Sequence, residues 1–285
     1  FCCARDYSAE PARARDDEPM IWHLWIDDLP RPGFINMGID SALLDLAELE
    51  GDAFLRLYRW SPPCLSFGRH EPAARRYRRE RIEALGLDTV RRPTGGRAVW
   101  HADELTYAVA APSGAMGSLA ESHRRIHEAL ARGLRYLGAD AALAPVARAA
   151  PLGAGACFDS AAGGEVTIAG RKVAGSAQLR TRAAFLQHGS LLLSGDQRVL
   201  SAVSARARPL ETALRGTESP PPDVTLRDAL GRRVSFAEAA EAITDAAREW
   251  APAESWLTLD RGGAIVERAA AFADIFRSAA WTWSR

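Results

Sequence analysis

A cysteine and a lysine, Cys157 and Lys172, are the first candidates for a reactive pair in this sequence. Lys172 is the only lysine among 36 basic residues, so the chain keeps one compact, titratable amine that arginine cannot replace. Cys157 lies fifteen positions earlier, and an ammonium nearby stabilises a thiol as the nucleophilic thiolate. A hairpin predicted between them brings them together, which suits acyl transfer through a thioester. The ordinary alternative for Cys157 is a small buried hydrophobe.

A second candidate site is the stretch RRPTGGRAVWH at residues 91–101. Two adjacent glycines after a strand let backbone amides approach a ligand closely. Arg92 and Arg97 lie on either side of that turn, and His101 follows one short strand later. The alternative interpretation is a hairpin turn that carries surface arginines.

The other histidines give weaker signals. His188 and Gly189 fall in a predicted strand, where an isolated histidine is usually a hydrogen-bonded core residue. His123 and His127 are four apart on a predicted helix, a spacing that can bind a metal. The sequence offers no third ligand beside them, so we expect no metal site.

Composition is typical of a soluble globular protein. The chain has 285 residues, of which 47% are hydrophobic and 25% charged. Basic and acidic residues number 36 each, so no global charge attracts nucleic acid or a membrane. Four cysteines without a C-x-x-C pair indicate a reducing compartment and exclude a zinc ribbon. No run of 18 apolar residues occurs, so we expect a cytoplasmic protein without a membrane span.

Shifts in composition and a proline-rich stretch predict one main domain with smaller flanking segments. Residues 1–19 are polar and Ala/Arg-rich, and we expect a disordered tail or a mis-assigned start before Met20. Residues 20–217 are expected to form the main, catalytic domain. The stretch ESPPPD at 218–223 is the predicted linker, and residues 224–285 are expected to form a small helical appendage.

Hydrophobic periodicity and turn signals place the elements. Predicted strands lie at 54–60, 65–69, 87–92, 104–112 and 183–193, and predicted helices at 36–50, 75–85 and 263–278. Two further helices begin at capping boxes, Ser118 with Glu121 and Ser235 with Glu238. Ala169-Gly170 marks a hairpin. This order of elements predicts an α/β fold with a mixed, mostly antiparallel sheet flanked by helices.

Two long motifs resemble the lipoate–protein ligase and octanoyltransferase superfamily. RRPTGGRAVWHADELTY resembles its substrate loop, and ACFDSAAGGEVTIAGRKVAGSAQLR followed by LQHGSLLL resembles its second signature. The resemblance covers roughly Trp25 to Leu193 and is closest to the cysteine-dependent octanoyltransferases. It implies a twisted sheet that encloses an acyl tunnel, similar to the biotin and lipoate ligase catalytic domains.

The resemblance also implies a role for each motif residue. Cys157 falls on the family's acyl-accepting nucleophile and would attack the thioester of octanoyl acyl carrier protein. Lys172 falls on the family's lysine and would stabilise the oxyanion together with backbone amides. The implied substrate-binding residues are Arg69, Arg92, Thr94, Gly95, Gly96, Arg97, His101, Ser176, Gln178, His188 and Gly189.

The implied acceptor is a lysine of a lipoyl-domain protein such as the glycine-cleavage H protein. Transfer would need no cofactor and would involve neither nucleic acid nor a membrane. One alternative is an ATP-dependent lipoate or octanoate ligase, which would require ATP and Mg²⁺. Another is a non-catalytic protein that binds an acyl carrier or a lipoyl domain.

The chain departs from the family's pattern in two places. Small residues occupy 161–164 after the cysteine, where bulky ones are usual, and Ala102 stands where an aspartate is common. Both affect the expected pocket and docking more than the expected fold. The arginines of the 75–85 helix are predicted to be a solvated face, with contact to an acyl carrier as the alternative.

Overall fold

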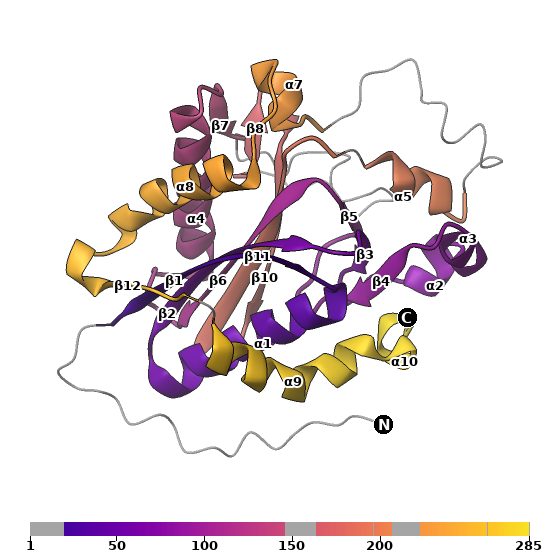
Figure 1. Cartoon of the computed structure of the whole chain (residues 1–285), viewed down its shortest axis with the longest axis horizontal. Helices are drawn as coiled ribbons and strands as arrows, with labels where there is room; N and C mark the ends of the chain where they lie inside the picture. The colour runs from indigo at the N-terminus through magenta and orange to yellow at the C-terminus, as the bar shows by residue number, and fades with distance from the viewer. Residues whose placement is uncertain (1–19, 146–163, 196, 207–222, 261, 285) are drawn as a thin grey trace.

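A six-stranded sheet in the order β10-β11-β6-β2-β1-β12 forms the centre of the protein (Figure 1). The computed structural model describes residues 20–145, 164–195, 197–206, 223–260 and 262–284. The six strands are β1 (Trp22–Arg31), β2 (Ala53–Trp60), β6 (Glu104–Pro112), β10 (Ala174–Arg180), β11 (Ala184–Leu192) and β12 (Trp256–Thr258). β10, β11, β6 and β2 pair antiparallel, while β1 lies parallel to both β2 and β12. The expected mixed, mostly antiparallel sheet is confirmed.

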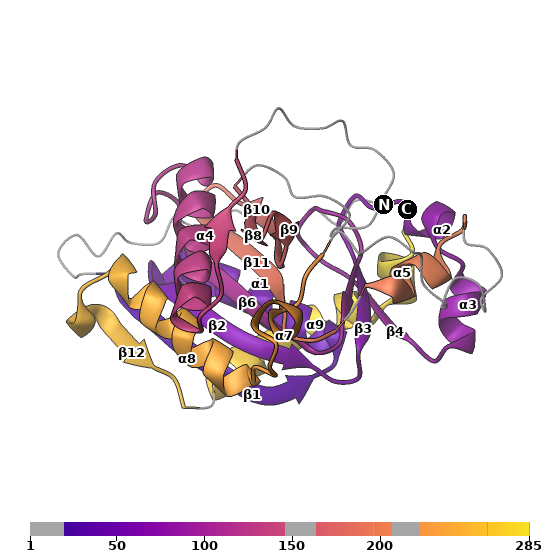
Figure 2. The same cartoon turned by 90° about the horizontal axis from the view of Figure 1, so that it is seen from above.

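Helices cover both faces of this sheet (Figures 1 and 2). One layer contains α1 (Gly33–Glu50) and α9 (Gly263–Arg277), and the other contains α4 (Leu119–Tyr136) and α8 (Phe236–Ala247). Successive side chains of a strand point to opposite faces. Tyr107 of β6 therefore packs in the core beneath α4 and α8, whereas its neighbour Ala108 packs in the core beneath α1 and α9.

Two small sheets flank the main one. The first contains β3 (Cys64–Phe67), β4 (Asp88–Arg91) and β5 (Val99–His101), and the second contains β7 (Ala141–Leu143), β8 (Val166–Ile168) and β9 (Arg171–Lys172). The predicted hairpin turn joins β8 to β9, with positive φ at Ala169 and Gly170. Within the described part of the chain, no helix is long and apolar enough to span a membrane.

Two predicted helices differ from the structure for visible reasons. α1 begins at Gly33 rather than at a cap on Asn36. The Asn36 side chain instead accepts a hydrogen bond from Arg56 and donates to backbone carbonyls. The predicted 75–85 helix is split into α2 (Ala73–Arg76) and α3 (Arg79–Ala84), because Tyr77 between them is extended and forms a bridge to Ser204.

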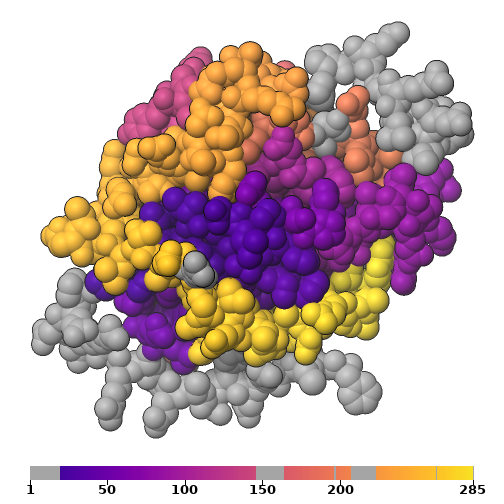
Figure 3. Space-filling model, viewed as in Figure 1, coloured from indigo at the N-terminus to yellow at the C-terminus, as the bar shows by residue number. Residues whose placement is uncertain are grey.

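Residues 224–285 do not form the expected appendage. β12 extends the main sheet, and Trp256 stacks on Trp22 of β1 with ring centroids 5.2 Å apart. α9 packs so closely on α1 that a Cβ at Gly38 would lie 3.0 Å from the Ala269 carbonyl oxygen. In the space-filling view the orange and yellow C-terminal segment borders the indigo segment that begins after residue 19 (Figure 3). The segment, which also contains α7 (Leu226–Leu230) and α10 (Ala279–Thr282), therefore belongs to the main domain.

Two other predicted boundaries fall where little is described. The tail at 1–19 lies outside the described residues. So does the predicted linker at 218–223, except for Asp223, whose backbone forms a bridge to Lys172. Both therefore remain predictions.

Candidate functional site

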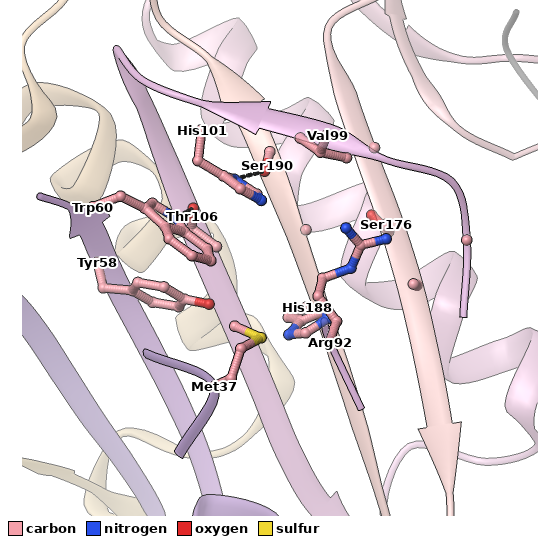
Figure 4. Close-up of a pocket in the computed structure, with 14 residues that line it drawn as sticks. Met37, Tyr58, Trp60, Arg92, Val99, His101, Thr106, Ser176, His188 and Ser190 are labelled. Carbon is pink, nitrogen blue, oxygen red and sulfur yellow. Dashed lines mark hydrogen bonds between the residues drawn. The ribbon is translucent and has the colours of Figure 1, made fainter. Parts of the chain in front are cut away.

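A pocket lies between α1, the sheet and the turn that follows β4 (Figure 4). Apolar side chains of Met37, Tyr58, Trp60 and Val99 form part of its lining. Six residues that the sequence predicted to bind substrate also line it, namely Arg92, Gly96, His101, Ser176, His188 and Gly189. The remaining lining residues are Thr106, Gly175, Ala177 and Ser190. A mostly apolar cavity with a few convergent polar groups is the usual form of a ligand site.

The Arg92 guanidinium holds the glycine turn in place. Its terminal nitrogen Nη2 donates to the carbonyls of Gly95 and Arg97 at 3.1 and 2.8 Å. The other terminal nitrogen, Nη1, donates to the carbonyl and the hydroxyl of Ser66. Gly96 has φ +86°, and a Cβ there would lie 3.3 Å from the guanidinium. Glycine is therefore required at this position by both backbone conformation and space. Gly95 and Arg97 contribute backbone carbonyls to this arrangement and do not line the pocket.

His188 connects the glycine turn to α1. Its Nδ1 lies 2.8 Å from the Asp40 carboxylate, so Nδ1 carries the hydrogen, and its Nε2 accepts from the Thr94 hydroxyl at 2.5 Å. Burial lowers the pKa of His188. The Asp40 carboxylate also accepts hydrogen bonds from the Tyr58 hydroxyl at 2.8 Å and from the Arg56 guanidinium at 3.1 Å. This network fixes the turn against the sheet.

His101 has a second arrangement of the same type. Its Nδ1 lies 2.7 Å from the Glu104 carboxylate, and its Nε2 lies 2.6 Å from the Ser66 hydroxyl. Ser190 donates to Glu104 at 2.9 Å, and the Trp60 ring stacks on the imidazole with centroids 3.9 Å apart. The lining therefore presents imidazoles whose orientations are set by buried carboxylates.

Both arrangements place a carboxylate, an imidazole and a hydroxyl in the order found in serine hydrolases. Ser66 and Thr94, however, are each 0% exposed. A nucleophile must reach its substrate. These hydroxyls therefore position the histidines and the turn and do not attack a substrate.

Lys172 is 2% exposed, and its Nζ lies 2.6 Å from a carboxylate oxygen of Glu165. Lys172 is not among the residues that line the pocket. Lys172 is the last residue of β9, and Val173 connects it to β10, which forms one wall of the pocket. Cys157, the predicted nucleophile, lies outside the described residues. Its predicted approach to Lys172 thus remains a prediction.

Ser176 and Gln178 extend from β10 toward α4. The Ser176 hydroxyl lies 2.7 Å from His127 Nε2 and 2.6 Å from the Tyr107 hydroxyl. His127 Nδ1 lies 2.6 Å from the Gly164 carbonyl oxygen. Both ring nitrogens of His127 therefore have hydrogen-bond partners within the protein. Burial lowers the pKa of His127 to about 3. Gln178 hydrogen-bonds to Gln187 at 2.6 Å and lies away from the pocket lining.

Arg69 is placed beside the glycine turn rather than in the pocket. Its backbone N–H donates to the Thr94 carbonyl at 2.7 Å, and its guanidinium lies 5.7 Å from the centroid of the Trp281 ring. Arg69 therefore supports the turn through its backbone, while its side chain faces the C-terminal helix α10.

Sequence patterns did not identify several residues that shape this site. Asp40 was missed because it lies 148 positions from His188, the predicted residue that it contacts, so no local spacing connects the two. Glu165 follows a glycine shortly before the predicted hairpin at Ala169-Gly170 and carries no signal of its own. Glu104 had the clearest available signal, because it follows His101 by three residues at the start of a buried strand.

Comparisons with known proteins agree on one family. The lipoyl protein ligase A/B catalytic domain matches residues 32–248. An octanoyltransferase LipM from Kyrpidia tusciae is 43% identical over 224 residues, covering 74% of this chain and 80% of that protein. An octanoyltransferase LipM from Exiguobacterium sibiricum is 34% identical over 285 residues, covering 93% of this chain and 99% of that protein.

Solved structures share the fold. A putative lipoate protein ligase from T. acidophilum with bound lipoic acid has a TM-score of 0.73 and 21% identity, covering 93% of this chain and all of that one (100%). A lipoate-protein ligase A bound with ATP has a TM-score of 0.71 at 21% identity, covering 93% of this chain and 99% of that one. At such identities the likeness establishes the fold alone.

Proposed function

This chain belongs to the lipoyl protein ligase A/B catalytic domain family and is a protein octanoyltransferase, and we propose that its donor is an octanoyl acyl carrier protein. The acyl group passes through a thioester on Cys157 to a lysine of a lipoyl-domain protein. The observation that carries this proposal is the 34% identity to an octanoyltransferase LipM over 93% of the chain. No cofactor takes part in the proposed transfer.

The proposed reaction has two acyl transfers. The Cys157 thiolate forms a bond to the thioester carbonyl carbon, and the bond to the carrier's sulfur breaks, releasing a thiolate that takes up a proton. The free amine of the acceptor lysine then attacks the enzyme thioester. An amide forms, the amine loses a proton to solvent, and the Cys157 thiolate is regenerated.

Lys172 supplies positive charge in this scheme. A buried ammonium held by Glu165 at 2.6 Å is fixed in position before the reaction. Such a group can stabilise the oxyanion of each tetrahedral intermediate that forms within its reach, an effect worth roughly 3–4 kcal/mol per donor. The apolar pocket wall formed by Met37, Tyr58, Trp60 and Val99 offers a surface for the octanoyl chain.

A transfer assay without ATP tests this function. The chain is mixed with octanoyl acyl carrier protein and an apo lipoyl domain, and the acceptor is weighed by mass spectrometry. We expect the acceptor to gain one octanoyl group. Modification only when ATP and free octanoate are supplied would instead establish the ligase alternative. Stable carrier binding with no modification under either condition would establish the binding-protein alternative.

A further inference from the structure

Positive charge is concentrated at one end of a molecule whose formal net charge is zero. Residues 69–84 contain six arginines against three glutamates, and residues 197–206 add two arginines and no acid. α2 and α3 lie in the first segment and α5 (Arg198–Val203) in the second. The segments are neighbours, since the Arg78 N–H donates to the Val203 carbonyl at 2.8 Å (Figures 1 and 2). We call these two segments the arginine surface.

Two arginines of this surface are exposed and lack an acidic partner among the described residues. Arg75 and Arg78 are exposed, and neither forms an ion pair with any residue that the structure describes. Arg79 pairs with Glu83 at 2.8 Å, but both side chains are more than half exposed, at 54% and 62%. The two segments together carry eight arginines against three glutamates, so a net positive field extends from this surface.

The arginine surface is held rigidly. Beneath it lies a buried apolar cluster that includes Phe67, Ile82, Leu200 and Val203. The Arg81 side chain also donates to the Ala202 carbonyl at 3.1 Å, which ties α3 to α5. A surface whose backbone is already ordered loses little conformational entropy when a partner binds.

This surface is continuous with the glycine turn of the pocket. Arg69 donates its N–H to the Thr94 carbonyl at 2.7 Å. Gly68 contacts Gly96 so closely that a Cβ at Gly68 would lie 2.0 Å from the Gly96 carbonyl oxygen. Gly96 lines the pocket. A molecule bound on the arginine surface is therefore adjacent to the site where its acyl group would react.

We propose that the arginine surface docks an acidic face of the acyl carrier protein that delivers the octanoyl thioester. This inference rests on the proposed function, because it assumes a protein-borne donor. Complementary charge at an interface steers association and selects among partners. The position beside the pocket favours a donor protein over nucleic acid, because a nucleic acid carries no acyl group to deliver to the pocket.

Charge reversal of Arg75 and Arg78, which form no ion pair with a described residue, tests the proposal. The variant Arg75→Glu/Arg78→Glu is compared with Arg227→Glu/Arg248→Glu, which reverses two exposed arginines on other elements. Binding of octanoyl acyl carrier protein is measured by titration calorimetry at low and high salt. Transfer kinetics are measured with the carrier and with octanoyl pantetheine, a small thioester that lacks the protein. Thermal melting confirms that each variant folds.

We expect the first variant to weaken carrier binding by about tenfold or more and to raise KM for the carrier, while kcat and transfer from octanoyl pantetheine stay unchanged. The control variant keeps wild-type binding. Salt should weaken carrier binding to the wild type more than to the first variant. Unchanged carrier binding, or equal weakening in the control, would overturn the proposal. So would equally tight binding of an unrelated DNA duplex to the wild type.

These outcomes are separate from the fate of the proposed function. If the wild type transfers from the carrier and the variant binds it normally, only the docking proposal fails. If the wild type transfers from neither donor, the proposed function fails, and the binding titration still decides whether the surface recognises the carrier.

Discussion

Lys172, whose buried amine is paired with Glu165, is the proposed oxyanion donor. Replacing it with alanine removes the proposed oxyanion donor and leaves the Glu165 carboxylate without the ammonium 2.6 Å away. We expect Lys172→Ala to lower kcat for octanoyl transfer by roughly 10²–10³-fold. Steady-state kinetics with octanoyl acyl carrier protein measure this effect. Arg180→Ala, at the exposed end of β10, serves as the control and should stay near wild type. A Lys172→Ala variant with near-normal kcat would exclude this role.

His127 makes stability depend on pH. Its pKa falls from 6.5 to about 3 on folding, chiefly because burial disfavours the charged imidazole. Between these values the unfolded chain binds a proton that the folded chain does not, so stability falls as the pH falls below 6.5. The slope for this one group is about 1.4 kcal/mol per pH unit. His188, whose pKa is also lowered by burial, acts in the same direction.

Urea unfolding at pH 7 and pH 5 measures this dependence. We expect the wild type to lose about 2 kcal/mol from His127 alone over that interval. The variant His127→Gln should lose correspondingly less, whatever its stability at pH 7. Equal losses in the two proteins would show that His127 is protonated in the folded state at pH 5.

Among the helices and strands, hydrophobic periodicity and capping signals predicted the elements that depend mainly on local sequence. β6 matches the predicted strand at 104–112, and both predicted capping boxes form. β1 was not predicted, because Asp27 and Asp28 are unfavourable in strands. In the structure the Asp27 carboxylate forms a buried ion pair with the Arg56 guanidinium at 2.6 Å, a contact between residues distant in sequence. β12 has only three residues, too few for a periodic signal.

The pairing of β10 with β11 explains why the QHGS motif contains a glycine. A Cβ at Gly189 would lie 2.4 Å from the Gly175 carbonyl oxygen on the neighbouring strand. We expect Gly189→Ala to destabilise the protein by about 1–3 kcal/mol, as overpacking usually does. A Cβ at Gly95 would have nothing within 4 Å, so Gly95→Ala should change stability by less than about 0.5 kcal/mol. Chemical denaturation of both variants checks the contrast, and equal stabilities would refute it.

At the scale of the whole molecule, the C-terminal segment completes the fold. α8 packs beside α4 so closely that a Cβ at Gly133 would lie 2.8 Å from the Ala242 carbonyl oxygen. The sequence suggested an appendage because ESPPPD is typical of a linker, yet the apolar residues beyond it cover both faces of the main sheet. Long-range packing of this kind has no local signature. The same holds for the site, where Asp40 and His188 meet across 148 positions.

A chain truncated after Asp223 tests this integration. It lacks β12, α8 and α9, so large apolar areas of both cores would face water. We expect the truncated chain to aggregate or to lack a cooperative unfolding transition by circular dichroism. A soluble fragment that unfolds cooperatively and transfers octanoyl groups would restore the appendage interpretation.

The proposed transfer depends on an octanoyl group carried by Cys157. Its most direct test is the intact mass of the protein after mixing with octanoyl acyl carrier protein, without ATP and without acceptor. We predict that the wild type gains one octanoyl group, which hydroxylamine at neutral pH removes as expected for a thioester, and that Cys157→Ala gains none. An equal gain on Cys157→Ala would contradict the claim, and so would an unmodified wild type under conditions in which the acceptor becomes octanoylated.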